Sequence, residues 1–200
     1  MEDKKRNILF SEEQINTRIK ELGKTIADDY KGKKIYLLSL LRGSFIYAAD
    51  LARAIDLETK IGFMTTSSYG HSETSSGTVK VVNDIPDNIE GWDVLIVDDI
   101  VDTGITMDFV VNHVKKLNPA SVKTCVLLDK PSRRKVEITP DYCCFEIEDV
   151  FVVGYGYFKS YCGNLPGEWQ GGGFAFTESC YIRFSCRVGK GTEYGGFKCD

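Results

Sequence analysis

Three aspartates and a Thr-Gly pair stand close together in the stretch VLIVDDIVDTGIT, residues 94–106. Asp98 and Asp99 follow the apolar run VLIV, and Asp102 comes shortly after them. Carboxylates that leave water repel one another, so a site that gathers them needs a cation, a proton or a polar ligand as compensation. The spacing therefore predicts a functional site that binds a cation, a proton or a polar ligand.

The turn that follows these acids predicts a cradle for a phosphate group. Backbone N–H groups at a helix N-terminus bind anions, and hydroxyl groups beside them add further donors. The residues that would offer these groups are Thr103, Gly104, Ile105 and Thr106. Acids beside a bare phosphate would repel it, whereas a sugar phosphate with hydroxyls, or a phosphate carried with Mg²⁺, suits the arrangement. The alternative without a ligand is a strand-end acidic pair in which Asp102 caps the following helix.

Alternating strands and helices are expected to position this site. Short apolar runs predict strands at residues 35–40, 60–67, 79–82, 94–97, 122–128, 141–147 and 150–153. Apolar stripes with helical spacing predict helices over residues 15–26, 45–55 and 107–117. This alternation predicts an α/β protein with a mainly parallel twisted sheet and helices on both faces. Ligands of such sheets bind at the carboxyl ends of the strands, which is where Asp98 and Asp99 are expected.

Local signals mark where some of these elements begin and end. Ser11 and Gln14 have the spacing of a capping box at the start of the first helix, and Gly32 ends that region. The stretch YGHSETSSGT, residues 69–78, is polar and has no apolar periodicity, so it predicts a loop.

Composition limits the partners and the location of the protein. A chain of 200 residues and 22.4 kDa is long enough for a globular domain with a buried core. A formal charge of −4 and a pI near 5.3 do not suit a nucleic-acid backbone or an anionic membrane, so small molecules are the expected partners. The N-terminus lacks the apolar run of a signal peptide, which predicts a cytoplasmic protein. Seven cysteines without a C-x-x-C pair predict reduced thiols.

The stretch VLIVDDIVDTGIT resembles the phosphoribosyl pyrophosphate motif of the type I phosphoribosyltransferases. Four further segments are similar, in the expected order, to the bacterial-type hypoxanthine-guanine phosphoribosyltransferases: LLSLLRGSFIYAADLARAI, SSYGHSETSSGTVKV, LLDKPSRR and DYCCFEIEDVFVVGYG. The resemblance covers about residues 8–156 and implies the type I fold, with a small hood built from terminal segments. It predicts a phosphoribosyltransferase core over residues 1–156 and an atypical Gly- and Cys-rich segment over residues 157–200.

The family's activity implies transfer of a 5-phosphoribosyl group from phosphoribosyl pyrophosphate to hypoxanthine or guanine, which forms IMP or GMP and pyrophosphate in purine salvage. Mg²⁺ is the implied cofactor, and a homodimer or homotetramer is the implied assembly. Asp98 and Asp99 would bind the ribose hydroxyls, directly or through Mg²⁺, and residues 103–106 would hold the 5′-phosphate. Asp102 resembles the general acid/base that manages the proton of the purine's imidazole nitrogen.

The turn LRGS resembles the pyrophosphate loop of the family. Leu41, Arg42 and Gly43 would bind pyrophosphate, with a cis peptide bond between Leu41 and Arg42. Ser68 and Tyr69 open a loop that resembles the lid over the reaction centre, which would keep water from the reacting sugar. Without the resemblance, both segments would be interpreted as an ordinary turn and a surface loop.

The remaining implied site residues contact the purine. Lys130 resembles the residue that donates to the 6-oxo group, and because an ammonium group only donates, it would select 6-oxopurines over adenine. Phe151 would stack on the base, and Val152 would offer backbone contacts to the ring edge. Without the resemblance, Lys130 would be predicted to lie in solvent, and Phe151 and Val152 to belong to a strand core.

The chain departs from the family pattern after residue 156. Family members usually continue with Leu-Asp and then Arg-Asn-Leu-Pro, whereas this chain reads YFKSYCGNLP, with Cys162 and Gly163 where the Arg is expected. In the family this Asp helps to bind metal and the purine edge, and this Arg contacts pyrophosphate. Residues 157–200 are therefore interpreted as disordered or mis-translated, or as real divergence. Two alternative functions stay open: a catalytically impaired regulator that binds phosphoribosyl pyrophosphate or a nucleotide, and a metal-dependent phosphatase.

Overall fold

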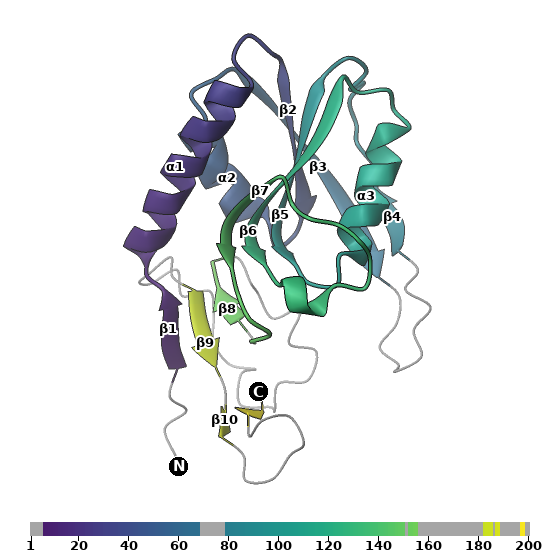
Figure 1. Ribbon diagram of the computed structural model, residues 1–200. Helices are drawn as coiled ribbons and strands as arrows, with labels where there is room; N and C mark the ends of the chain where they lie inside the picture. Colours follow the sequence, from purple (N-terminus) through teal and green to yellow (C-terminus); the bar gives the residue numbers. More distant parts are fainter. Residues whose placement is uncertain are drawn as a thin grey trace, which may run out of the picture. The chain divides into compact units, whose positions relative to one another are not determined.

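The computed structural model describes residues 6–68, 79–150, 152–155, 182–185, 187–188 and 197–198 (Figure 1). Contacts divide the chain into two units. The first, called the main unit below, is Thr17–Asp149, and the second, called the terminal unit, combines Met1–Asn16 with Val150–Asp200. Most of the candidate site residues lie in the main unit.

A mainly parallel sheet forms the centre of the main unit. Among the described residues it has six strands in the order β4-β3-β2-β5-β6-β7. Their bounds are β2 (Ile35–Leu41), β3 (Thr59–Ser68), β4 (Val79–Asn83), β5 (Asp93–Val101), β6 (Ser121–Asp129) and β7 (Tyr142–Glu146). Neighbouring strands are parallel except for the edge strand β4, which is antiparallel to β3. The predicted α/β fold class is confirmed.

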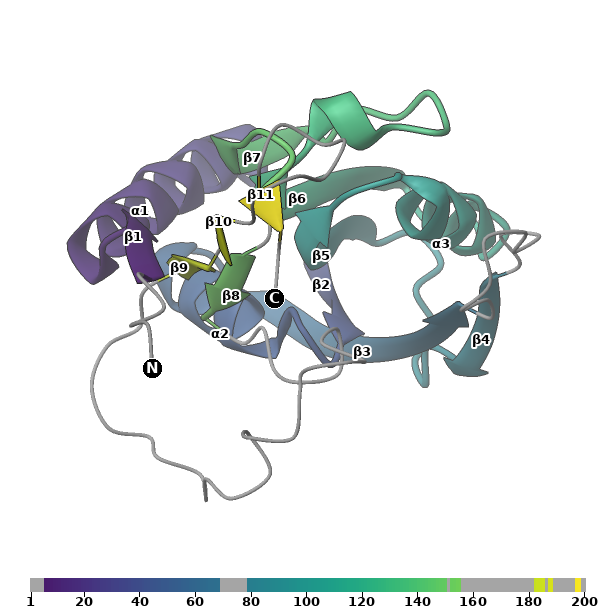
Figure 2. The same ribbon diagram turned by 90° about the horizontal axis from the view of Figure 1, so that it is seen from below.

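Helices cover both faces of this sheet. The main unit contains most of α1 (Glu12–Asp29), together with α2 (Phe45–Ala54) and α3 (Ile105–Lys115). Figure 2 shows α1 and α2 on one face of the sheet and α3 on the other. A short 3₁₀ turn, η1 (Pro131–Arg133), follows β6. No helix among the described residues is both long and apolar enough to cross a membrane.

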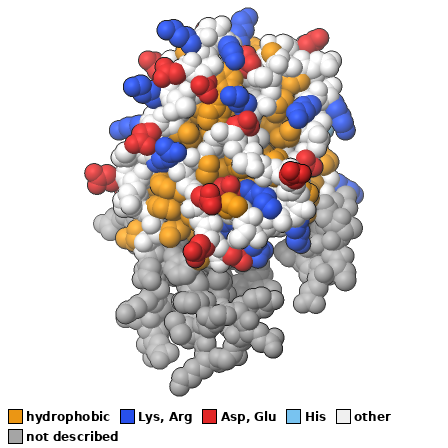
Figure 3. All heavy atoms as spheres, viewed as in Figure 1, with side chains coloured by type: hydrophobic (Ala, Val, Ile, Leu, Met, Phe, Trp, Pro, Cys, Tyr) orange, Lys and Arg blue, Asp and Glu red, His pale blue; other side chains and the backbone are white. Residues whose placement is uncertain are grey.

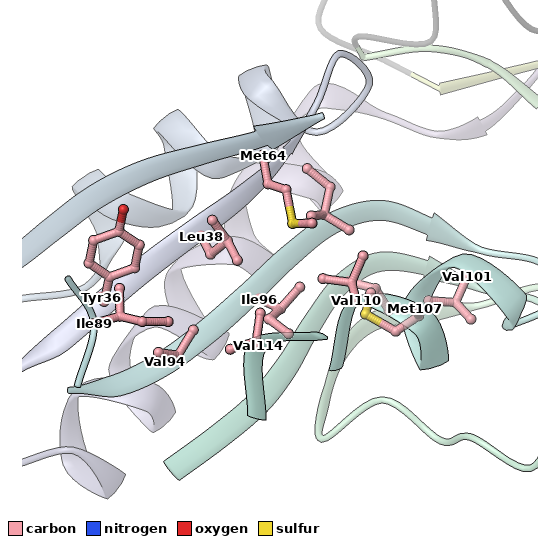
Figure 4. Close-up of a cluster of buried hydrophobic side chains, with 12 residues drawn as sticks. Tyr36, Leu38, Met64, Ile89, Val94, Ile96, Val101, Met107, Val110 and Val114 are labelled. Atoms are coloured by element: carbon pink, nitrogen blue, oxygen red, sulfur yellow. The ribbon is translucent and has the colours of Figure 1, made fainter. Parts of the chain in front are cut away.

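The core on the α3 face follows the alternation of the strands. Every second residue of a strand points to the same face, so one face of β2 and β5 packs against the apolar stripe of α3. Figure 4 shows the members of this cluster that are labelled, among them Leu38, Ile96, Met107, Val110 and Val114. Full burial of a large apolar side chain stabilises the fold by about 1.5–3 kcal/mol, which ties α3 firmly to the sheet.

On the opposite face of the sheet, cysteine thiols are buried and are not joined in disulfides among the described residues. The Tyr47 hydroxyl of α2 lies 3.1 Å from Cys125 Sγ and 3.5 Å from Cys144 Sγ. The described cysteines are free, which agrees with the prediction of reduced thiols. Burial raises the pKa of the Cys144 thiol to about 11, so it stays protonated and packs as a small hydrophobic group.

The start of α1 has the predicted capping box. The Ser11 N–H donates to Gln14 Oε1 at 2.8 Å, and the Gln14 N–H donates to Ser11 Oγ at 3.2 Å. These two bonds satisfy donors that the first helical turn leaves without partners.

The terminal unit contains two small antiparallel sheets within its described residues. One has the order β1-β9-β8, formed by β1 (Arg6–Phe10), β8 (Val152–Gly154) and β9 (Ile182–Ser185). The other pairs β10 (Arg187–Val188) with β11 (Phe197–Lys198). The predicted boundary at residue 156 and the departures at Cys162 and Gly163 lie outside the described residues.

Candidate active site

Asp98 and Asp99 lie within the central strand of the main sheet. The predicted strand ended at Val97, but β5 continues to Val101, so the two acids are part of the strand and do not follow it. Asp99 is buried, with 5% of its surface exposed, and Asp98 is half-buried. The Oδ1 of Asp99 accepts a hydrogen bond from the Ile100 N–H at 2.9 Å, whereas the Oδ2 of Asp99 has no hydrogen-bond partner in the described part of the chain.

The acidic pair is held in an environment that opposes its ionisation. Burial raises the pKa of both carboxyls, and the charge of Asp99 raises the pKa of Asp98 further. The described residues hold no group of three or more His, Cys, Asp or Glu side chains that could bind a metal without other ligands. Mg²⁺ is usually bound by one or two carboxylates together with substrate phosphates. The orphaned Asp99 oxygen and its neighbour therefore fit a Mg²⁺ ion that arrives with a phosphate.

The LRGS turn, residues 41–44, lies directly against Asp99. A Cβ atom on Gly43 would stand 1.9 Å from Asp99 Oδ2, so only glycine allows this approach. Ser44 Oγ donates to the Leu40 carbonyl at 2.5 Å and lies 2.8 Å from Ser39 Oγ, which fixes the turn against β2. The peptide bond between Leu41 and Arg42 is cis, as the resemblance implied. The turn and the acidic pair are thus one structural feature.

The cradle, residues 103–106, contains the start of α3. Gly104 is the residue that caps the helix, and its φ of 81° lies in the left-handed region that favours glycine. Asp102 is therefore not the helix cap, and that alternative interpretation is wrong. The Asp108 N–H donates to the Gly104 carbonyl at 2.9 Å, so the N–H groups that precede it lack a partner within the helix. They are the donors that an anion would bind.

Asp102 stands just beyond β5 and pairs with an arginine of η1. Arg133 Nε donates to Asp102 Oδ1 at 2.9 Å, and Arg133 Nη1 donates to Asp149 Oδ2 at 3.2 Å. These bonds, above all the one to Asp102, raise the pKa of the Arg133 guanidinium. The sequence patterns did not single out Arg133 or Asp149, because side-chain pairing between separate loops has no local signal.

Lys130 is buried, with 8% of its surface exposed, so the interpretation of this residue as a solvent-exposed lysine is wrong. Its N–H donates to the Val101 carbonyl at 3.0 Å, which joins the end of β6 to the end of β5. Its Nζ lies 3.9 Å from Asp149 Oδ1. The structure therefore brings the predicted purine contact to the same edge of the sheet as Asp102.

Arg134 holds the backbone of this edge together. Its Nη1 donates to the carbonyls of Val101, at 2.8 Å, and of Asp102. Its Nε donates to the Ile138 carbonyl at 3.1 Å, and its Nη2 pairs with the Asp129 carboxylate. Sequence reasoning missed this residue, although it belongs to the segment LLDKPSRR that carried part of the resemblance.

The other predicted site residues fall elsewhere in the chain. Ser68 is the last residue of β3, and Tyr69 and Phe151 lie outside the described residues. Val152 begins β8 in the terminal unit and is described with that unit.

The fold and the site define a phosphoribosyltransferase. The sequence model of the phosphoribosyl transferase domain matches residues 7–159, and the chain belongs to this family. It is 47% identical over 165 residues to the hypoxanthine-guanine phosphoribosyltransferase of Aquifex aeolicus, which covers 82% of this chain and 93% of that relative. It is 42% identical over 161 residues to the enzyme of the same name from Bacillus subtilis, with 80% and 89% covered.

Solved structures agree with these sequence relatives. The hypoxanthine-guanine phosphoribosyltransferase of Bacillus anthracis matches with a TM-score of 0.77 and 38% identity, over 89% of this chain and 97% of that one. A hypoxanthine phosphoribosyltransferase from Trypanosoma cruzi, in a ternary substrates complex, matches with a TM-score of 0.76 and 41% identity, over 89% and 94%. The chain is therefore an enzyme of the hypoxanthine-guanine phosphoribosyltransferase type, as predicted. Nothing in these matches supports an impaired regulator.

Proposed function

We propose that this chain transfers the 5-phosphoribosyl group of phosphoribosyl pyrophosphate to hypoxanthine or guanine, with release of pyrophosphate, as a step of purine salvage. The observation that carries this function is the edge of the main sheet where β5 and β6 end. A helix N-terminus, an acidic pair of which Asp99 is buried, and a buried lysine lie there. These three groups suit the phosphate, the ribose diol and the 6-oxopurine of the reaction.

The sugar substrate would lie along the acidic pair and the cradle. Residues 103–106 would bind its 5′-phosphate through backbone N–H groups and hydroxyls. Asp98 and Asp99 would bind the diol and hold a Mg²⁺ ion, which when bound supplies positive charge beside the pyrophosphate. Gly43, with Leu41 and Arg42, would bind the pyrophosphate, because this turn adjoins Asp99.

The base would be held by its six-membered ring and deprotonated at its imidazole. Lys130 would donate to the 6-oxo group, while Phe151 and Val152 would contact the ring. As the bond from the sugar carbon to pyrophosphate breaks and the bond to the purine nitrogen forms, Asp102 would take the imidazole proton. Ser68 and Tyr69 would belong to a lid that excludes water.

We also propose that the chain acts in the cytoplasm as a homodimer or homotetramer. Phe45, Ile61 and Phe63 are 46%, 43% and 48% exposed, and a second copy would cover them. Ile61 and Phe63 lie beside Leu37 and Ser39 of β2, on the same face of the sheet. On the face drawn in Figure 3, charges of both signs are interspersed, which does not suit a nucleic-acid partner.

A spectrophotometric assay of nucleotide formation tests the function. We expect the wild type and the exposed control Asp56→Ala to form IMP from hypoxanthine, and a chelator of divalent cations to stop the reaction. Asp102→Ala should be slower by about 10²- to 10⁴-fold, which is the usual contribution of a general acid/base. Equal rates for wild type and Asp102→Ala would remove Asp102 from the mechanism. Calorimetric binding of phosphoribosyl pyrophosphate without any product would contradict the transfer function and favour the impaired alternative.

A further inference from the structure

Four charged side chains of alternating sign follow one another beside the end of β5. Lys130 Nζ lies 3.9 Å from Asp149 Oδ1, and Asp149 Oδ2 accepts a hydrogen bond from Arg133 Nη1 at 3.2 Å. Arg133 Nε then donates to Asp102 Oδ1 at 2.9 Å. The chain of charges therefore runs from the proposed 6-oxo contact to the proposed general acid/base.

Backbone hydrogen bonds hold the members of this charge chain in place. The turn η1 closes through the Arg133 N–H, which donates to the Lys130 carbonyl at 3.1 Å, so both side chains leave the same turn. The Ile147 N–H donates to the Asp129 carbonyl at 2.8 Å and anchors the segment that carries Asp149. The arrangement is thus built by three loops that meet at the ends of β5, β6 and β7.

We propose that Arg133 is a positioning residue for Asp102 in the transfer reaction, and that Asp149 couples it to Lys130. This inference rests on the proposed function. The 6-oxo oxygen and the proton-bearing imidazole nitrogen of a 6-oxopurine lie on the same edge of the base. A base held by Lys130 is therefore deprotonated only if the Asp102 carboxylate stands at a set distance from it, and Arg133 sets that distance.

The charges around Asp102 support this role over a purely structural one. The Arg133 guanidinium bonds to the Asp102 side chain, the Arg134 guanidinium bonds to its carbonyl, and Asp149 and Lys130 act through Arg133. The side chains of Arg133 and Asp102 are 46% and 40% exposed, and ion pairs with such exposure add little to stability. Removal of Arg133 should therefore change the reaction while the fold persists.

Steady-state kinetics test the proposal, with Arg133→Met, Arg133→Lys, Asp149→Asn and the wild type. Arg53→Met is the matched control, because Arg53 is an exposed arginine that pairs with Asp50 on α2, away from this edge. We expect Arg133→Met to lower kcat/KM for hypoxanthine by about tenfold. The loss should fall on kcat, while KM for phosphoribosyl pyrophosphate stays within about twofold of wild type, because Arg133 bonds to the Asp102 carboxylate and has no proposed contact with the sugar. Arg133→Lys should restore part of kcat, and Asp149→Asn should mainly raise KM for the purine.

A double-mutant cycle with Asp102→Asn separates positioning from general damage. If Arg133 acts through Asp102, then Arg133→Met should cause no further loss in the Asp102→Asn background. The same loss in both backgrounds, or an unchanged kcat in Arg133→Met, would overturn the inference while an active wild type left the proposed function intact. A wild-type chain that formed no nucleotide would overturn the proposed function, and this inference with it.

Discussion

The acidic pair of β5 and Asp102 lie a few residues apart, yet the fold gives their carboxyl groups different surroundings. Asp98 and Asp99 are desolvated, and in the described part of the chain no ion pair joins either carboxylate, so burial raises their pKa values. Asp102 is 40% exposed and already accepts a hydrogen bond from Arg133. The acidic pair has no ion-pair partner among the described residues, whereas Asp102 already pairs with Arg133. The difference supports the proposed roles, in which the pair binds the diol and Mg²⁺ and Asp102 takes a proton from the purine.

The sheet explains why neighbouring acids differ in this way. β5 lies between β2 and β6, so a residue inside it, such as Asp99, is enclosed by neighbouring strands and by the Gly43 turn. Asp102 stands past the last residue of β5 and faces η1, which follows β6 and carries the cationic side chain of Arg133. Asp102 is only three positions after Asp99, yet it lies beside a charged loop, whereas Asp99 is enclosed in the sheet.

Loss of Arg134 should have the largest effect on stability, in the region around Asp102 where charged side chains are paired. The side chains of Arg134 and Asp129 are only 15% and 10% exposed, so Arg134→Met would leave a buried carboxylate and several carbonyls without partners. Breaking a buried pair in this way usually destabilises a protein by about 3–5 kcal/mol. Urea unfolding of the purified variant measures the loss.

The adjacent Arg133 is the matched control for this change. Because its ion pairs are exposed, Arg133→Met should lower the free energy of unfolding by about 1 kcal/mol or less. Equal losses for the two neighbouring arginines would show that burial does not distinguish them.

Gly43→Ala should have the next largest effect, in the region around Asp99, whose Oδ2 has no hydrogen-bond partner among the described residues. The new Cβ would stand 1.9 Å from Asp99 Oδ2, so the buried carboxylate or the turn has to move. A displacement of about 1 Å at a reacting site can lower the rate about 100-fold, and we expect kcat/KM for phosphoribosyl pyrophosphate to fall by this order. Assays at saturating purine measure it, and a rate within twofold of wild type would mean that the contact is not needed.

Gly104→Ala should destabilise the protein more than the same substitution at Gly91, a glycine of similar backbone conformation outside the cradle. Gly104 and Gly91 have φ values of 81° and 73°, so alanine at either position carries a conformational penalty of about 1–2 kcal/mol. Only at Gly104 would the Cβ also overlap a neighbour, at 2.7 Å from Ile138 Cγ2, whereas Gly91 has open space. We expect an excess loss of about 1 kcal/mol and a raised KM for phosphoribosyl pyrophosphate. Thermal unfolding of the two variants side by side isolates the contact, and identical losses would rule it out.

Sequence alone predicted the strands and helices of the main unit, because these depend on local periodicity, but it did not predict β1 or the strands after residue 156. It could not predict the contact between Gly43 and Asp99, which arises only when β2 and β5 become neighbours in the sheet. The exposure of Lys130 was wrongly predicted without the resemblance, because burial of a lysine depends on the loops that fold over it. Arg133 and Arg134 are adjacent and chemically identical, so their different roles depend on the orientation of η1.

The smallest effect, with the opposite sign, is expected for Asp99→Asn. A carboxyl whose pKa is raised by folding stabilises the protein below its ordinary pKa, and that stability is lost as pH rises through the raised value. At neutral pH the pair therefore opposes folding. Asp99→Asn should raise the free energy of unfolding by about 1 kcal/mol while activity falls, as happens when a strained functional group is removed. Calorimetric melting at pH 5 and pH 8 measures the gain, which should be larger at pH 8.

Asp87 offers a control for which the sign is reversed. Hydrogen bonds from Lys60 and Tyr36 lower the pKa of its carboxyl, so it stabilises the fold above the ordinary carboxyl pKa, and that stability is lost as pH falls. Asp87→Asn should therefore lower the melting temperature at pH 8, where Asp99→Asn raises it. Mg²⁺ with phosphoribosyl pyrophosphate should stabilise the wild type more than Asp99→Asn, because only the wild type keeps both acids for them. If Asp99→Asn melted below the wild type at pH 8 without ligands, the buried pair would not be in an unfavourable charge state, and the contrast with Asp102 would fail.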